Sequence, residues 1–193
     1  MCGRYYVDDD TAKEIEKIAA KIDEKLNLRY SGDIRPSGNS IVLRGQGKQL
    51  QAASMIWGFP GYSGKGLIIN ARAESVLERS TFRNSAERRR CVIPAKGFYE
   101  WNRKKEQYSC EREGVPVVWM AGCYDRFQDQ DRFVIITTAA NVSVAPVHDR
   151  MPLLLEKEEL EDWIFDSRSA EFMLRKTPPA LRVSTEYTQL ELF

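Results

Sequence analysis

The residues with the clearest chemical potential stand at the start of the chain, MCGRYY. If Met1 is removed, Cys2 carries a free α-amine and a thiol on one residue. The reference pKa is about 7.7–8.0 for an α-amine and about 8.5 for a thiol, so part of each is unprotonated near neutral pH. Such an aminothiol can condense with an aldehyde and close it into a five-membered thiazolidine ring. The alternative is that Met1 stays and position 2 has no function.

The other cysteines and the single histidine limit the remaining chemistry. Cys91, Cys110 and Cys123 stand in apolar, strand-like contexts, and we expect them to be inert core thiols. The cysteine spacing matches no metal motif or disulfide framework, and one histidine, His148, cannot form a multi-histidine site. We therefore expect no metal, no cofactor and, by default, a reducing cytoplasmic location.

Composition excludes several classes of protein. The 193 residues and 42% hydrophobic content suit a single folded domain spanning residues 1–193. Lysine and arginine number 29 against 28 aspartate and glutamate, so a DNA-binding surface must be a local groove rather than a global field. The sequence contains no run of about 18 apolar residues, so we expect no membrane-spanning segment. The polar, acidic start of the chain does not resemble a signal peptide.

The elements that must position these residues are strands in the middle of the chain and helices toward its ends. Helical spacing of apolar residues predicts helices within 10–28, 71–80, 156–165 and 169–176. Apolar and β-branched runs predict strands at 41–44, 51–59, 90–94, 97–101, 115–125 and 132–140. The polar QDQD predicts a hairpin between the last two strands, and the composition of residues 30–40 is typical of turns. The mixture indicates an α+β domain around a twisted sheet or partly closed barrel.

Five short stretches, in this order and spacing, together resemble one family. They are MCGR (1–4), WGFPG (57–61), INARAES (69–75), RCVIPAKGFYEW (90–101) and HDRMPLLL (148–155). The set is similar to the SOS-response-associated peptidase (SRAP) family, whose members form covalent cross-links with abasic sites in single-stranded DNA. The resemblance spans nearly the whole chain. It implies a mixed, antiparallel β-barrel-like core flanked by helices, a positively charged DNA groove, and abasic single-stranded DNA as the partner.

The resemblance also assigns roles to residues. Cys2 matches the catalytic cysteine, Asn70 an active-site amide, Glu100 the acidic residue beside the cysteine and His148 the active-site histidine. Three arginines match residues that hold the DNA backbone, namely Arg4, Arg72 and Arg150. These residue types suit aldehyde capture, which needs several proton transfers.

Each catalytic assignment also has a physical role and an alternative. Glu100 in a desolvated pocket would have a raised pKa and shuttle protons, or it could face solvent. His148 could donate to the sugar oxygen during ring opening or assist reversal of the thiazolidine ring, or it could be a structural histidine. Asn70 could orient the amine or carbonyl of Cys2, or simply form a turn.

The chain departs from the family pattern in three places. Members commonly place bulky aromatics after the PG of FPGYSGKG, but here Tyr62 is followed by Ser63. Base stacking contributes about 1–3 kcal/mol per base, so the protein would grip junction DNA less firmly or use Phe82 more. DIRPSG at 33–38 replaces an Asn-any-Ala-Pro pattern, and STEYTQLELF at 184–193 lacks a common Val-Asn pair. These changes concern DNA contacts rather than the Cys2 chemistry.

Several functions remain open from the sequence. The leading one is capture of abasic sites through Cys2, with strand cleavage by β-elimination from the same Schiff base as a further activity. A second is a cysteine hydrolase or autopeptidase with Cys2 as nucleophile and His148 as base. A third is a non-covalent single-stranded DNA binder, which predicts salt-dependent, reversible binding. The preferred DNA structure, the reversibility of the adduct and the route of Met1 removal are not readable, and a monomer is the default.

Overall fold

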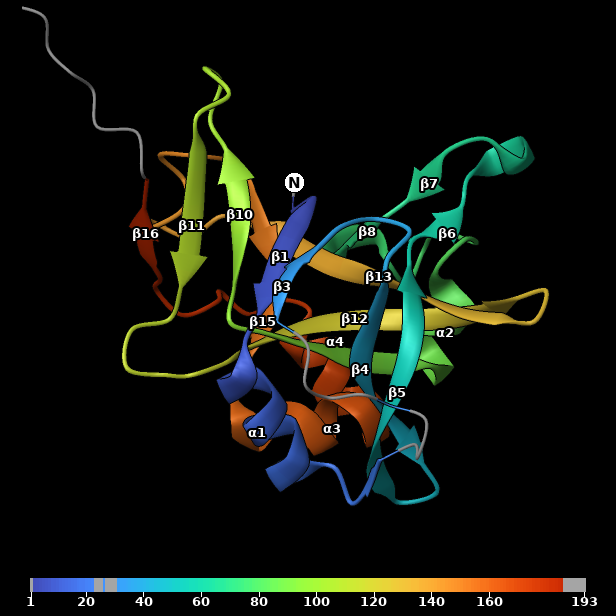
Figure 1. Ribbon diagram of the computed structural model, residues 1–193. Coiled ribbons are helices and arrows are strands. Elements are labelled where there is room, and N and C mark those ends of the chain that lie inside the picture. Colours follow the sequence, from blue (N-terminus) through green and yellow to red (C-terminus); the bar gives the residue numbers. More distant parts are fainter. Residues whose placement is uncertain (1, 23–25, 27–30, 186–193) are drawn as a thin grey trace, which may run out of the picture.

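A closed barrel of five strands forms the core of the computed structural model, which describes residues 2–22, 26 and 31–185 (Figure 1). The barrel strands, in spatial order, are β13 (Gln130–Ala139), β12 (Val118–Phe127), β9 (Arg90–Ala95), β4 (Asn39–Gln46) and β5 (Gln49–Trp57). Neighbours pair antiparallel, and the ring closes through a parallel pairing of β13 with β5. An odd number of strands cannot alternate direction all the way round, so one pair must be parallel. The α+β class with a barrel-like core is confirmed.

Successive side chains along the barrel strands point to opposite faces and pack in two separate hydrophobic clusters. Leu43 and Val92, which pair between β4 and β9, pack in the cluster that contains the helices. Their neighbours Val42 and Ile93 pack in a second cluster with the N-terminal arm. All six residues of β9 are buried for this reason. A strand covered on both faces is rich in apolar residues, which is why CVIPA (91–95) stands out in the sequence.

The first helix, α1 (Asp9–Ile18), begins at a capping box and ends earlier than predicted. The Asp8 side chain accepts a hydrogen bond of 2.9 Å from the backbone of Thr11. The backbone is extended at Ala19, and β2 (Lys21–Ile22) pairs in parallel with the edge of β5. The helix predicted within 10–28 is therefore wrong for residues 19–22, because β5 offers these residues backbone partners. Residues 23–25 and 27–28 of that prediction lie outside the described part of the chain.

The helix predicted at 71–80 is also wrong. Its first residues belong to β8 (Asn70–Arg72), which pairs in parallel with β13, and a 3₁₀ turn, η2 (Ala73–Ser75), follows. The next helix, α2 (Arg83–Arg88), begins only later. These residues join the sheet because the backbone N–H and C=O groups of β13 are available for pairing at this point. A local apolar spacing cannot show such a distant partner.

Most other predicted elements are confirmed. The hairpin through QDQD joins β12 to β13, with Gln128 in a left-handed turn conformation. The late helices form as α3 (Leu160–Phe165), preceded by η3 (Lys157–Glu159), and α4 (Ser167–Met173). The turn predicted at 30–40 contains a short strand, β3 (Gly32–Ile34). Within the described residues no helix is long and apolar enough to cross a membrane.

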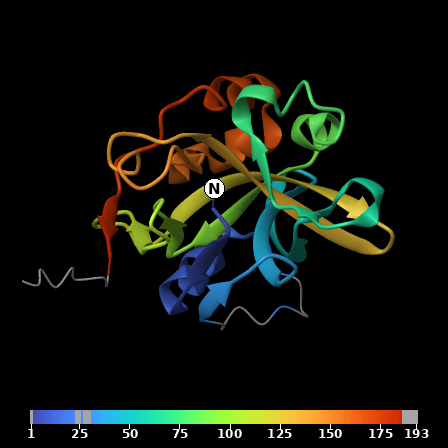
Figure 2. The same cartoon turned by 90° about the horizontal axis from the view of Figure 1, so that it is seen from above.

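A second sheet and a projecting finger flank the barrel (Figures 1 and 2). The sheet has the order β16 (Arg182–Ser184), β11 (Gln107–Glu111), β10 (Gly97–Trp101), β1 (Arg4–Val7) and β3. The finger consists of β6 (Phe59–Pro60), η1 (Tyr62–Gly64) and β7 (Leu67–Ile68). In both views the N-terminal arm lies between the finger and the β10–β11 pair. The remaining strands are β14 (Arg150–Pro152) and β15 (Leu154–Leu155).

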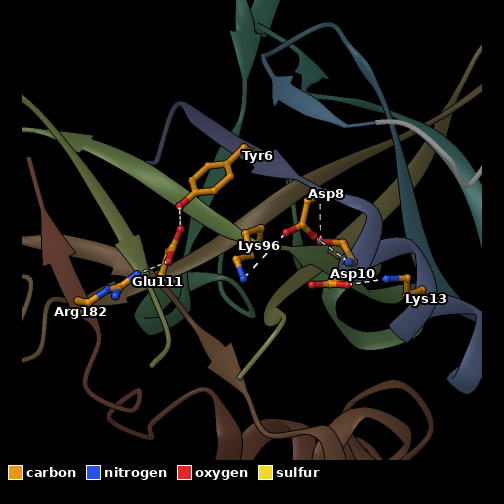
Figure 3. A network of polar contacts seen from close by, with 8 residues as sticks. Tyr6, Asp8, Asp10, Lys13, Lys96, Glu111 and Arg182 are labelled. Atoms are coloured by element: carbon orange, nitrogen blue, oxygen red, sulfur yellow. Dashed lines mark hydrogen bonds and ion pairs between the residues drawn. The ribbon is translucent and has the colours of Figure 1, made fainter. Parts of the chain in front are cut away.

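A network of polar contacts fixes β1 to its neighbours (Figure 3). The Tyr6 hydroxyl donates to Glu111 on β11 at 2.5 Å, and Arg182 on β16 holds the other carboxylate oxygen at 2.9 Å. Lys96 lies 3.9 Å from the carboxylate of Asp8, which directly follows β1. These contacts fix the end of β1 that lies farther from Cys2.

Candidate active site

Cys2 lies two residues before the start of β1 and is fully buried, at 0% exposed. It packs in the core cluster that also contains Tyr5, Trp57 and Phe98. Its thiol donates weakly to the carbonyl oxygen of Arg4 at 3.8 Å. Burial, together with the nearby charge of Glu100, raises the pKa of this thiol well above its ordinary value. The sulfur is therefore a neutral thiol at neutral pH, held close to the carboxyl group.

Asn70 connects Cys2 to the barrel. It is the first residue of β8 and pairs with Ile135 of β13. Its side-chain nitrogen donates a hydrogen bond of 2.9 Å to the backbone carbonyl oxygen of Cys2. The amide oxygen of Asn70 is buried and accepts no hydrogen bond from the described residues. The side chain therefore orients Cys2 and keeps one acceptor for a further donor.

Glu100 is buried beside Cys2, with only 1% of its surface exposed. It lies on β10, next to β1, in the register that pairs Tyr99 with Arg4. The burial alternates along GFYEW, so Tyr99 and Trp101 are half-buried and Glu100 points into the protein. Burial raises the pKa of Glu100 to about 7, and the charge of Asp149 contributes in the same direction. This carboxyl group can therefore both donate and accept a proton near neutral pH.

His148 lies in the loop before β14 and is neutral at neutral pH. Its Nδ1 atom accepts a hydrogen bond of 3.0 Å from the backbone N–H of Arg150, which leaves the ring proton on Nε2. The carboxylate of Asp149 also lies 3.0 Å from Nδ1. Burial outweighs that carboxylate and lowers the pKa of the ring. In the tautomer that accepts from Arg150, the neutral imidazole offers Nε2–H as a donor.

A cavity of about 720 Å³ joins the histidine to the strand of Glu100. Trp101 borders it from β10, and His148 and Asp149 border it from the opposite loop. Arg103 and Lys104 add positive charge to the same wall. A cavity with an aromatic ring, a histidine and two cations suits a nucleotide better than an apolar ligand.

The three arginines assigned to the DNA backbone differ in their freedom. Arg4 lies 5.3 Å from the ring centre of Trp101, and 3.4 Å from the carboxylate of Asp33. Arg72 is exposed on β8, two residues after Asn70. Arg72 is therefore open to a ligand in solvent, whereas a phosphate at Arg4 would compete with Asp33.

Arg150 is held inside the protein. Its guanidinium forms a two-pronged ion pair with Glu74, at 2.6 and 2.9 Å, and donates to the carbonyl oxygen of Thr137 at 2.7 Å. Only 14% of the side chain is exposed. A phosphate would therefore have to compete with a carboxylate for this arginine, whose visible role is to fix the strand that begins beside His148.

The two aromatic residues assigned to DNA lie apart from the catalytic group. Tyr62 is 76% exposed on the finger, and its hydroxyl shares a hydrogen bond with Thr81. Phe82 is partly buried and packs 6.1 Å from the ring of Phe59. The finger thus offers one accessible ring, whereas Phe82 serves mainly to anchor the base of the finger.

The three remaining cysteines are buried with raised pKa values, as expected of core thiols: Cys91, Cys110 and Cys123.

Sequence reasoning did not assign roles to three residues at the site. Trp101 borders the cavity, Asp149 raises the pKa of Glu100, and Glu74 pairs with Arg150. All three stand inside the quoted motifs GFYEW, HDRMP and INARAES. Their position beside the assigned residues was the available signal, but their contacts depend on strand pairing across the sheet.

The fold and the site together define a small α+β barrel protein with a buried cysteine on its N-terminal arm. The chain belongs to the SOS response associated peptidase (SRAP) family, whose model matches residues 1–188. It is 30% identical over 181 residues to the abasic site processing protein YoqW of Bacillus subtilis, covering 85% of this chain and 80% of that protein. It is 26% identical over 178 residues to the abasic site processing protein YedK of Escherichia coli, covering 85% and 79%.

Solved structures share the fold at lower identity. A protein from Bordetella bronchiseptica superposes with a TM-score of 0.79 at 21% identity, covering 97% of this chain and 100% of that one. A protein from Bacteroides thetaiotaomicron gives a TM-score of 0.78 at 21% identity, covering 95% and 91%. At this identity the likeness supports the architecture described above.

Proposed function

We propose that this protein processes abasic sites in single-stranded DNA by forming a covalent thiazolidine cross-link through Cys2 after removal of Met1. The observation that carries the proposal is the grouping of Cys2, Asn70 and Glu100. The amide of Asn70 fixes the backbone of Cys2 at 2.9 Å, and the carboxyl group with a pKa of about 7 lies beside the thiol. The names of the relatives YoqW and YedK support the same substrate.

The chemistry balances with the groups present. The α-amine of Cys2 adds to the aldehyde carbon of the ring-opened sugar and gives a carbinolamine. Protonated Glu100 donates to the leaving hydroxyl, and one water departs to leave an iminium. The sulfur then bonds to the iminium carbon, and its proton returns to the Glu100 carboxylate. The net reaction joins aldehyde, amine and thiol with loss of one water, and Glu100 is regenerated.

The closed form of an abasic sugar must open before the amine can attack. The Nε2–H of His148 suits donation to the ring oxygen, because Nδ1 is already occupied as an acceptor. Arg4 and Arg72 suit contacts with the phosphates on either side of the lesion. Strand cleavage by β-elimination from the iminium is a further activity that this arrangement allows.

The order of reaction distinguishes this proposal from a cysteine hydrolase. A hydrolase needs a thiolate activated by a base. Burial raises the pKa of the Cys2 thiol, which favours first attack by the amine and later closure by the sulfur.

A monomer in the cytoplasm stays our expectation, and four free, buried cysteines suit a reducing compartment.

The test is incubation of the purified protein with single-stranded DNA that carries one abasic site, followed by a denaturing gel and intact-mass analysis. The expected mass is that of the protein without Met1 plus the DNA minus one water. Cys2→Ala should give no adduct, and an alanine inserted between Met1 and Cys2 should abolish the adduct while leaving the thiol. Cys123→Ala is the matched control and should react normally. An adduct in the insertion variant, or none with a confirmed free Cys2, would contradict the proposal.

A further inference from the structure

One loop supplies a whole wall of the cavity that contains His148. Residues 145–149 follow one another in the chain, and all of them border this cavity. The loop begins at Asn141, whose carbonyl oxygen accepts from the backbone N–H groups of Val144 and Ala145 at 3.2 and 2.9 Å. The backbone N–H of His148 in turn donates to the carbonyl oxygen of Val144 at 3.0 Å. The place of the histidine therefore depends on the turn that starts at Asn141.

The side-chain oxygen of Asn141 closes this turn from inside the protein. Only 8% of Asn141 is exposed. Its Oδ1 atom accepts from the hydroxyl of Ser143 at 2.6 Å and from the backbone N–H groups of Ser143 and Val144 at 3.0 and 3.3 Å. Val144 is fully buried and packs in the same core cluster as Cys2. The amide oxygen thus holds the loop against the core beside the active site.

The side-chain nitrogen of Asn141 ties the loop to a second segment, the TPPAL stretch that leads into β16. Proline has no backbone N–H, so such a stretch is fastened mainly through its carbonyl groups. Asn141 Nδ2 donates to the carbonyl oxygens of Pro178 and Pro179 at 3.1 and 2.7 Å. The N–H of Leu181 donates to the hydroxyl of Ser143 at 3.0 Å. In Figure 2 the orange loop and the red segment that ends at β16 run side by side, as these bonds require.

We propose that Asn141 is a positioning residue for His148, whose ring keeps its place in the cavity wall because one buried amide holds the loop on both sides. Only an asparagine or glutamine side chain offers N–H donors and an accepting oxygen together. Aspartate has nearly the same shape but would set a carboxylate against the carbonyl oxygens of Pro178 and Pro179. The effect on catalysis rests on the proposed function, whereas the placement of the ring does not.

The test uses the fact that His148 is the only histidine of the chain. In protein that contains isotope-labelled histidine, a single set of ring signals in the NMR spectrum reports its tautomer and its pKa. The wild type should show Nδ1 without a proton, since that atom accepts from Arg150, and a pKa below the ordinary value, since the ring is partly buried. Asn141→Asp should mix the two tautomers and raise the pKa, because a loosened loop exposes the ring to water.

Two further variants separate this effect from added charge and from misfolding. Val142→Asp places the same charge in the same loop on a side chain that is 89% exposed, so it should keep the wild-type signals. Ser143→Ala removes the hydroxyl that links Asn141 to Leu181 and should give a smaller change in the same direction. Wild-type signals in folded Asn141→Asp, or the same change in Val142→Asp, would overturn the proposal. If Asn141→Asp does not fold, wild-type signals in Ser143→Ala overturn it.

Cross-linking rates then connect the placement to the reaction. With saturating DNA, Asn141→Asp should react with an abasic sugar about tenfold more slowly or worse, and normally with an open-chain aldehyde. In the His148→Ala background the same change should cause no further slowing, because both act through one ring. Equal slowing on both substrates, or further slowing in the double variant, overturns the link. A wild type that forms no cross-link would refute the proposed function, and the histidine signals would still decide whether Asn141 places the ring.

Discussion

The side-chain amide of Asn70 donates a hydrogen bond of 2.9 Å to the backbone carbonyl oxygen of Cys2, which lies 68 positions earlier in the chain. Asn70 is itself fixed by the parallel pairing of β8 with β13. Cys2 is therefore positioned by the barrel and not only by its own short arm. An arm that retained several conformations would have to be ordered during each reaction, at a cost in rate.

Replacement of Asn70 should slow cross-linking without unfolding the protein. In Asn70→Ala the carbonyl oxygen of Cys2 loses its donor, and Asn70→Asp places a carboxylate against that oxygen. We expect the first change to lower the single-turnover rate by about 10- to 100-fold, as is typical when a reacting group loses its orientation. The aspartate should be at least as slow. The rate is measured with abasic single-stranded DNA in excess, and exposed Asn84→Ala is the control. A wild-type rate in both variants would show that the amide does not position Cys2.

The pH dependence of cross-linking should report Glu100. Burial raises the pKa of this carboxyl group to about 7, so its acid form disappears as the pH rises through that value. Because the acid form assists loss of water, the wild-type rate should level off and then fall above about pH 7, against the rising fraction of free amine. Glu100→Gln should be slower and should lack this falling limb. Rates across the pH range, with equal protein mass confirmed, decide the point. A falling limb that persists in the glutamine variant would assign it to another group.

The same carboxyl group should make stability depend on pH. Its folded pKa is raised above the unfolded value of 4.5, so the folded state binds the proton more strongly between 4.5 and about 7. Stability is fully present below the lower value and falls as the pH rises, by up to about 1.4 kcal/mol per pH unit. Urea denaturation should therefore show wild type losing stability between about pH 5 and pH 7 more steeply than Glu100→Gln. Equal slopes would mean that Glu100 is not desolvated in the folded protein.

Much of the architecture is readable from the sequence because the signals are local. CVIPA (91–95) is apolar since both faces of β9 are covered, and QDQD turns because polar residues tolerate the left-handed conformation seen at Gln128. The two wrong helices fail for one reason. Residues 19–22 and 71–72 find backbone partners on β5 and β13, which lie far away in sequence. No periodicity within a short window contains that information.

The candidate site, too, was only partly predictable from the sequence. The motif positions proposed Cys2, Asn70, Glu100 and His148 as candidates, and the structure brings the first three together. Whether Glu100 is buried depends on the register of β10 against β1, so the sequence alone could not decide between a buried and a solvent-exposed Glu100. The capture of Arg150 by Glu74 depends on β8 and β14 flanking the same strand, β13. Contacts across a sheet are fixed by the fold as a whole.

His148 should matter only for substrates that must open a ring. Its Nε2–H is the available donor, because Nδ1 accepts the backbone N–H of Arg150. His148→Ala should slow cross-linking to an abasic sugar by about 10²-fold, a usual contribution of general acid catalysis. The same variant should react normally with DNA that carries an open-chain aldehyde unable to cyclise. Equal slowing on both substrates would assign His148 to a step after ring opening. His148→Gln tests whether an amide donor restores part of the rate.

Gly97 should be intolerant of any side chain because it brings β10 close to its neighbours. A Cβ atom at this position would lie 2.6 Å from the backbone oxygen of Cys110 and 2.5 Å from the hydroxyl oxygen of Tyr6. The first contact is with backbone, so β10 must move away from β11 to relieve it. We expect Gly97→Ala to destabilise the protein by about 1–3 kcal/mol, the usual range for overpacking.

The same displacement should reach the active site, since Glu100 stands three residues further along β10. Cross-linking by Gly97→Ala should therefore be slower than stability alone explains, when it is measured at a temperature where the variant is fully folded. Gly45→Ala on β4 is the matched control: its Cβ would meet the ring of Phe165 at 2.7 Å, and that ring is partly exposed and can turn aside. We expect the control to lose some stability and keep the wild-type rate. If both variants kept that rate, the position of β10 would not govern the chemistry of Glu100; if Gly97→Ala unfolded like the wild type, the close packing at Gly97 would itself be wrong.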